Sequence, residues 1–202
     1  MESKESMALV QEMILKAKKS FSKFSFYFLM WGWLLAVSGI MEFIMMKLNY
    51  SHAWLPWMIF PIIGAIWSGA HGAKQGRKQQ HVTFTDRVMM GIWSSFFVTL
   101  VVLIFCCVYS GNNPGPYITI ITALPTMITG FLLNFNPLKF GGIFFWIMGI
   151  VTFLVPSIYI PLIFALALLG GYITPGILLR NCLLYTSPSP RDLSTSRMPS
   201  SA

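Results

Sequence analysis

The sequence predicts an all-α membrane protein, a bundle of about six transmembrane helices preceded by an amphipathic N-terminal helix. Of its 202 residues, 55% are hydrophobic and 10% are charged, whereas about 25% are charged in an ordinary soluble domain. The mean hydropathy is +0.68. Apolar runs close to the roughly 20 residues that cross a bilayer fill most of the chain. We therefore expect one membrane domain and little soluble structure.

The net charge of +8 has two explanations. A basic protein can bind nucleic acid, but here the lysines and arginines lie in short segments that flank apolar runs. This arrangement is typical of cytoplasmic loops in membrane proteins. We interpret the charge as setting the orientation in the membrane, and we expect the lipid bilayer, and no nucleic acid, as a partner.

Residues 1–23 form the one sustained charged segment and predict the amphipathic helix. Apolar residues recur there at the spacing of a helix face, while Lys16, Lys18 and Lys19 fall mostly elsewhere on the helix. The apolar positions are Val10, Met13, Ile14, Ala17, Phe21 and Phe24. Two roles fit this pattern: an interfacial helix that lies on anionic lipid, and a docking helix for a protein partner.

The first two apolar runs predict spans at residues 24–46 and 54–73. The first follows a lysine-rich segment and contains the small residues Ala36 and Ser38, so a cleaved signal peptide is an alternative. Apolar character continues well past Ser38. This continuation favours a span that the protein retains.

Small residues recur at four-residue steps in the second span, at Gly64, Ser68 and Gly72. Residues four apart lie on one face of a helix. Because small residues let helix backbones approach closely in lipid, we expect these three to form a helix-packing face.

Four further runs predict spans at residues 88–109, 117–135, 138–155 and 158–179. A basic loop lies before the first of them and carries the residues that we expect to determine topology: Lys74, Arg77, Lys78 and Arg87. For residues 138–179 an alternative is a single broken or re-entrant segment, because Pro156 and the Gly170-Gly171 pair interrupt it.

The distribution of positive charge predicts the orientation. With the N-terminus inside, 11 lysines and arginines before residue 181 fall on inner segments, and Lys47 alone falls on an outer one. Cytoplasmic loops carry this excess, so we expect a multi-pass protein of the bacterial inner membrane with a cytoplasmic N-terminus. Aromatic residues then gather at the outer interface: Tyr50, Trp54, Trp57, Tyr109, Tyr117 and Tyr159.

Glu42 is the one acidic residue inside an apolar run and the candidate intramembrane functional residue. Intramembrane carboxylates are costly and often functional, which suggests a proton- or cation-binding role. Glu42 also lies only about four residues, or about 6 Å, from the end of its span. In the alternative interpretation it reaches outer water or pairs with Lys47.

No stretch of the sequence carries a recognisable catalytic or metal-binding pattern. His71 and His81 flank the basic loop without Cys, Asp or Glu at ligand spacing, and Cys106-Cys107 is expected to pack in the third span. We therefore expect no catalytic residues, no cofactor and no metal.

The last residues differ in character from the rest. The stretch Cys182-Leu-Leu-Tyr-Thr-Ser-Pro-Ser-Pro-Arg-Asp192 resembles one reading frame of a transposase adapter used in sequencing libraries, and Ser196–Ala202 resembles the primer beyond it. The resemblance implies that residues 182–202 are a non-native tail and that the natural C-terminus is lost after about Asn181. The alternative is a natural Ser/Pro-rich tail.

Three apolar motifs carry a second resemblance: Leu29-Met-Trp-Gly-Trp-Leu34, Phe140-Gly-Gly-Ile-Phe-Phe-Trp146 and Gly171-Tyr-Ile-Thr-Pro-Gly-Ile-Leu-Leu-Arg180. With them, residues 1–181 resemble a family of small, uncharacterised bacterial multi-pass inner-membrane proteins. The resemblance implies a helical bundle and no particular activity.

Three classes of function remain. The sequence favours a non-enzymatic membrane protein that acts through protein partners, as a regulatory or scaffold subunit, because residues 1–23 suit docking and the spans contain few polar residues. The alternative is a small-solute or ion transporter that uses Glu42 and spans interrupted by Gly and Pro. An intramembrane enzyme has no motif in its favour.

Overall fold

The computed structural model describes the backbone of residues 2–76 and 84–185, and the side chains of residues 24–74, 76 and 84–181. Every regular element in these ranges is a helix. Five of the helices are long and apolar enough to cross a membrane. The protein is thus an all-α membrane bundle, as its composition predicts.

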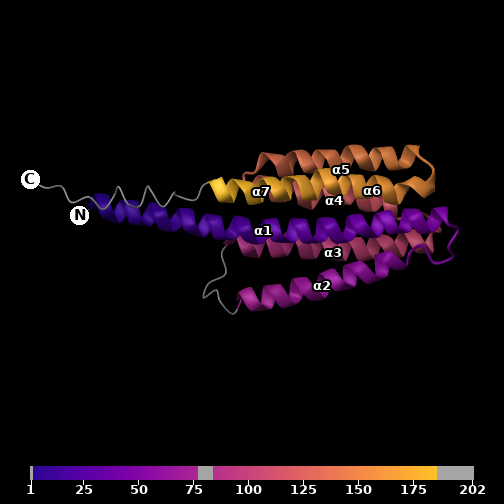
Figure 1. Ribbon diagram of the computed structural model, residues 1–202, viewed down its shortest axis with the longest axis horizontal. Coiled ribbons are helices and arrows are strands. Elements are labelled where there is room, and N and C mark those ends of the chain that lie inside the picture. The colour runs from indigo at the N-terminus through magenta and orange to yellow at the C-terminus, as the bar shows by residue number, and fades with distance from the viewer. Residues whose placement is uncertain (1, 77–83, 186–202) are drawn as a thin grey trace, which may run out of the picture.

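Long helices follow one another in antiparallel passes (Figure 1). The last pass consists of four consecutive elements. The elements are α1 (Glu2–Lys47), α2 (Leu55–Gly76), α3 (Phe84–Tyr109), α4 (Gly115–Leu132), α5 (Asn136–Leu154), the 3-10 turn η1 (Ser157–Tyr159), α6 (Ile160–Leu168), the π-helical turn η2 (Leu169–Ile173) and α7 (Thr174–Tyr185).

The turns contain the residues that helices tolerate least. Asn49 and Asn134, just after α1 and α4, have φ angles of 53° and 48°, a region that asparagine enters more readily than most residues. Gly111 follows α3 with a φ of 70°. Pro116 and Pro137 lie in the first turns of α4 and α5, where a missing N–H costs little. These positions place the helix ends within a few residues of the predicted spans.

The first helix differs from the expectation of an N-terminal helix followed by a separate span. Residues 2–31 contain no Gly or Pro, and α1 runs as one helix of 46 residues through Lys23. At about 1.5 Å per residue it is about 69 Å long, more than twice the roughly 30 Å of a bilayer core. For residues 1–23 to lie flat on the membrane, the chain would have to bend near Lys23, where α1 is continuous.

Five of the six expected spans coincide with helices that are long and apolar enough to cross a membrane. The five candidate spans are Phe24–Lys47, Phe84–Tyr109, Gly115–Leu132, Asn136–Leu154 and Ser157–Asn181. Helix α2 has 22 residues and lies antiparallel to α1 (Figure 1), but His71, Lys74 and its four glycines lower its hydropathy. A crossing by α2 stays a prediction. Residues 138–179 form two antiparallel passes, α5 and the continuous helix from α6 to α7.

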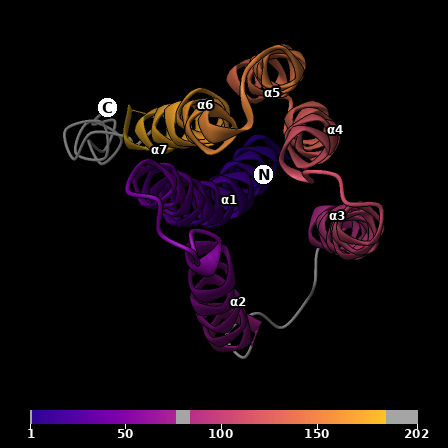
Figure 2. The same ribbon diagram turned by 90° about the vertical axis from the view of Figure 1, so that its right-hand side faces the viewer.

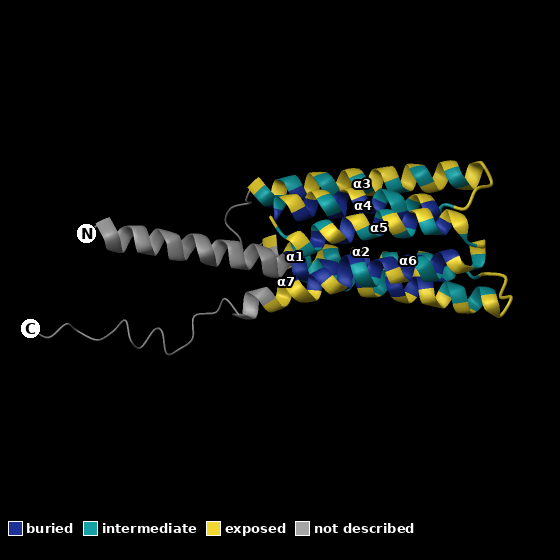
Figure 3. Ribbon diagram, turned by 90° about the horizontal axis from the view of Figure 1, so that it is seen from above, coloured by how far each residue is buried: buried dark blue, intermediate teal, exposed yellow. Residues whose placement is uncertain are grey.

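Seen from one end, α1 lies between two groups of helices (Figure 2). It packs along α6, η2 and α7 on one side and along α2 on the other, while α4 packs on α5 and α3 packs on α4. Buried residues concentrate where α1, α4, α5, α6 and η2 meet (Figure 3). Helix α3 is the least buried of the five candidate spans. The tightly packed core is therefore formed by the last three passes and α1.

Candidate functional site

Glu42 lies on α1 near its end, and its partner comes from α2. The Trp57 indole Nε1–H donates a hydrogen bond of 2.5 Å to Glu42 Oε2, and the Trp57 ring lies 5.5 Å from the Phe164 ring of α6. Glu42 is half-buried. The Glu42 carboxyl group is thus held at a junction of three helices, α1, α2 and α6.

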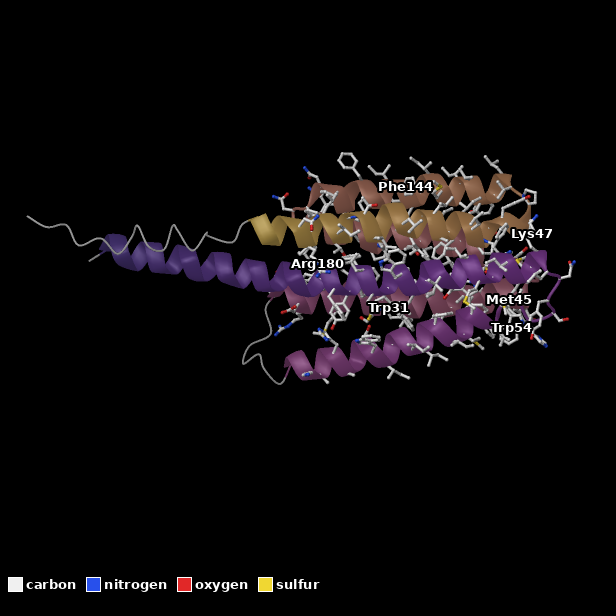
Figure 4. The ribbon with its side chains drawn as sticks, viewed as in Figure 1. Trp31, Met45, Lys47, Trp54, Phe144 and Arg180 are labelled. Carbon is white, nitrogen blue, oxygen red and sulfur yellow. The ribbon has the colours of Figure 1, made fainter. Side chains whose placement is uncertain are left out.

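Lys47, the expected alternative partner of Glu42, has other neighbours. Its ammonium group lies 5.9 Å from the centre of the Phe43 ring and 5.4 Å from that of Tyr159, within the range of cation–π attraction. Figure 4 shows Lys47 and Trp54 at the same end of the bundle. Lys47 therefore connects α1 to the turn before α6. The Glu42 carboxyl group accepts its hydrogen bond from the Trp57 indole.

The small residues of α2 face aromatic side chains of α1. Ser68 Oγ accepts a 3.1 Å hydrogen bond from Trp31 Nε1, and a Cβ on Gly64 would lie 3.1 Å from the same indole. A Cβ on Gly72 would lie 3.6 Å from the Tyr27 hydroxyl. The three residues accommodate large rings and so differ from a face that brings two backbones together.

The basic residues separate to opposite ends of the described structure. Lys74 is in the last turn of α2, Arg87 in the first turn of α3 and Lys139 in that of α5. These three helix ends lie at the end of the bundle where Figure 4 shows Arg180, opposite Lys47. Arg77 and Lys78 lie outside the described residues.

The bundle contains a polar row that the sequence analysis did not identify. Thr119, Thr122, Thr126 and Thr129 are all buried on one face of α4, so the expectation that the spans are almost free of polar residues is wrong here. The signal was present, because steps of three, four and three residues place side chains on one helix face. Charged residues and metal ligands are the usual signs of a functional site in a span, and threonine is neither.

Three of these four threonine hydroxyls donate hydrogen bonds to backbone carbonyls of α4 itself. Thr119, Thr122 and Thr126 donate to the carbonyl four residues earlier, at 2.8, 2.7 and 2.7 Å. This pattern satisfies a hydroxyl in an apolar interior without a second helix. Thr129 Oγ1 lies 3.7 Å from Met89 Sδ of α3. Because each threonine hydroxyl already uses its one hydrogen, these hydroxyls can make further hydrogen bonds only as acceptors.

Tyr172 lies at the centre of the bundle, next to this row. It is 3% exposed, and its hydroxyl is 3.5 Å from Thr126 Oγ1. Its ring centre lies 5.3 Å from that of Phe28, 5.1 Å from Phe145 and 6.3 Å from Trp93. Residues from α1, α3, α4, α5 and η2 thus converge on one phenol.

The π-helical turn that carries Tyr172 depends on glycine. A Cβ on Gly171 would overlap the Phe145 ring, and a Cβ on Gly141 of α5 would lie 2.7 Å from the Gly171 carbonyl oxygen. The two backbones therefore touch. An open groove of about 360 Å³ adjoins this contact, lined by Pro137, Phe140, Gly141, Phe144, Gly170, Thr174 and Pro175.

Possible metal ligands and similarity to known proteins give no further information about this site. Among the described residues, no three His, Cys, Asp or Glu side chains group closely enough to hold a metal ion. Comparisons of the chain with protein families, curated proteins and solved structures give no match. The site is therefore interpreted from its own residues: a carboxylate held by Trp57 at one end of the bundle, and buried hydroxyls around Tyr172 at its centre.

Proposed function

We propose that this protein is a non-enzymatic, multi-pass protein of the bacterial inner membrane that acts as a regulatory or scaffold subunit, binding a protein partner through residues 1–23. Its N-terminus and the end of α7 lie in the cytoplasm. The separation of Lys74, Arg87, Lys139 and Arg180 from Lys47 supports this orientation, because positive residues favour the cytoplasmic side.

The observation that carries the proposal is the length of α1. The helix begins at Glu2, 22 residues before Phe24, where the apolar run of the first predicted span begins. That extension is about 33 Å long and projects from the end of the bundle (Figure 1). A helix that projects from the membrane on the cationic side is well placed to bind a cytoplasmic protein.

Affinity purification in mild detergent tests this function. Residues 1–181 and residues 21–181 are expressed in native-like membranes and purified, and the co-purifying proteins are quantified by mass spectrometry. We expect a stoichiometric partner with the longer chain and at least a tenfold loss with the shorter one. Equal recovery of every partner by both chains would contradict the docking role.

A second candidate, transport of a small cation or proton, is favoured by one observation. Glu42 sits inside a candidate span with a neutral indole as its hydrogen-bond donor, and intramembrane carboxylates are costly and often functional. The test is flux into proteoliposomes. Flux that Glu42→Gln abolishes and Glu12→Gln leaves unchanged would establish transport and refute the partner-only function.

A further inference from the structure

The Glu42 carboxyl group uses only one of its two oxygens within the part of the chain that the structure describes. Trp57 is its one hydrogen-bonding partner there, and the indole N–H donates to Oε2. An indole has one hydrogen to donate and no acceptor, whereas a carboxyl group has two oxygens with about four lone-pair sites. Oε1 of Glu42 is therefore available to a ligand from outside the chain.

No cation in the described part of the chain forms an ion pair with this carboxyl group. Lys47 is the nearest cation along α1, but its ammonium group lies over the rings of Phe43 and Tyr159, 5.9 and 5.4 Å from their centres. An ionised carboxyl group that is partly out of water is costly unless a positive charge compensates it. The site therefore favours a ligand that brings one positive charge.

The other titratable side chains at this end of the bundle have neighbours of their own. They are Lys47 at the end of α1, Tyr50 and His52 in the turn before α2, and Tyr159 in η1. The His52 ring lies 6.2 Å from the Tyr50 ring. Helices α2 and α6 contribute Trp57 and Phe164 to the junction, and neither side chain titrates. Since Glu42 is the only acidic residue between Glu12 and Asp86, it is the one carboxyl group at this junction.

The surroundings of Glu42 do not suit a metal ion or an organic cation. Ca²⁺ takes about six to eight oxygen ligands and Mg²⁺ about six, whereas the side chains at the junction, Trp57 and Phe164, supply no oxygen. An organic cation is held by aromatic rings, but Lys47 already lies over the rings of Phe43 and Tyr159. A proton is the cation that a single carboxyl oxygen can hold.

We propose that Glu42 is a proton-binding site. A proton from the solution at the Lys47 end of the bundle binds Oε1, and the charged carboxylate becomes a neutral carboxylic acid. Trp57 donates to Oε2 in both forms, since that oxygen carries lone pairs in each of them. Helix α2 therefore stays attached to α1 while the charge of the junction changes.

The position of Glu42 gives the proton a short way in. Glu42 is half-buried and lies five residues before Lys47, where the candidate span ends, or about 8 Å along the helix. In the proposed orientation this end faces the outer side. The inference narrows the second candidate function, because the species that Glu42 takes up is a proton, and it rests on that function only for passage of the proton across the membrane.

Labelling with dicyclohexylcarbodiimide tests the inference. This apolar reagent couples to a protonated carboxyl group, and mass spectrometry of residues 1–181 in lipid vesicles locates the modified residue. We expect at least tenfold more labelling of Glu42 than of Glu12 at neutral pH, and at least a tenfold loss of the Glu42 label at alkaline pH. Glu42→Gln should abolish that label and fold as before, because its amide oxygen can still accept from Trp57. An unlabelled Glu42, a label that pH does not change, or a label that Ca²⁺ or Na⁺ suppresses at constant pH would overturn the inference.

Flux measurements in the same vesicles separate this inference from transport itself. A pH-sensitive dye inside the vesicles reports proton entry, and an ion-sensitive dye reports metal ions. The expected labelling together with proton flux that Glu42→Gln abolishes would support both. The expected labelling without flux would leave the proton site standing and refute transport through Glu42. Metal-ion flux that Glu42→Gln abolishes, with Glu42 unlabelled, would support transport and refute the proton site.

Discussion

The indole N–H of Trp57 donates to the Glu42 carboxylate at 2.5 Å and so joins α2 to α1 near the end of the bundle that carries Lys47. At a second level, Trp31 of α1 donates to Ser68 of α2 at 3.1 Å. Each of the two helices thus contributes one tryptophan that donates a hydrogen bond to the other helix. Because α2 packs mainly on α1, these two hydrogen bonds contribute directly to holding α2 in the bundle.

Removing the Trp57 donor should loosen α2. Side-chain hydrogen bonds within a membrane contribute about 0.6–1.7 kcal/mol, so Trp57→Phe should destabilise the protein by about 1 kcal/mol. In a double-mutant cycle with Glu42→Ala, unfolding measured in mixed detergent should give a coupling energy above about 0.5 kcal/mol. Additive effects of the two substitutions would mean that the contact contributes no stability.

Two glycines of α2 provide a comparison of its faces. A Cβ at Gly64 would lie 3.1 Å from both Trp31 and Leu34, whereas one at Gly69 would meet nothing within 4 Å. Gly64→Val should therefore cost about 1–3 kcal/mol through overpacking, and Gly69→Val should change stability by less than about 0.5 kcal/mol. Thermal unfolding in one detergent checks both; equal losses would place α2 in a different rotation.

Tyr172 and Tyr109 make a similar pair. Tyr172 is 3% exposed and Tyr109 is 86% exposed. Tyr172→Ala should destabilise the bundle by about 3–5 kcal/mol, as truncation of a buried aromatic residue does, while Tyr109→Ala should cost less than about 0.5 kcal/mol. Tyr172→Phe should cost only about 0.6 kcal/mol, a typical value for a side-chain hydrogen bond within a membrane. Comparable losses for the two alanine variants would contradict a core centred on Tyr172.

The C-terminal tail can be tested without the protein. Residues 182–202 resemble translated adapter sequence, so we expect the uninterrupted gene to diverge from this sequence after about Asn181. Amplification and sequencing across that point from the source DNA checks this. A gene that encodes Ser187-Pro-Ser-Pro-Arg191 in continuity with the spans would show that the tail is native.

Local chemistry made much of the fold predictable. Asn112, Asn113 and Pro114 lie between the predicted spans 88–109 and 117–135 and favour the turn found before α4, because helices tolerate such residues poorly. The length of the apolar runs predicts the five candidate spans. The continuity of α1 was predictable too, since residues 2–31 contain no Gly or Pro. We separated that helix from its span because charge and apolarity change at Lys23, although composition can change within a straight helix.

The contacts between helices were not predictable. Which donor reaches Glu42 depends on how α2 is rotated against α1, and one sequence does not contain that angle. Lys47 was the nearest partner along the chain, but Trp57, fifteen residues from Glu42, is the partner in space. The threonine row of α4 could have been found from its spacing, yet its neighbour Tyr172 lies forty-six residues from Thr126.

Cysteine accessibility in spheroplasts tests the membrane arrangement most directly. Cys106 and Cys107 are replaced by alanine and the chain is ended at Asn181, and single cysteines are introduced at Ser3, Gly76 and Asn113. An impermeant thiol reagent should label position 113 from outside, and positions 3 and 76 only after permeabilisation. Labelling of position 3 or 76 in intact spheroplasts would place the α1 extension or the cationic end outside the cell and contradict the account.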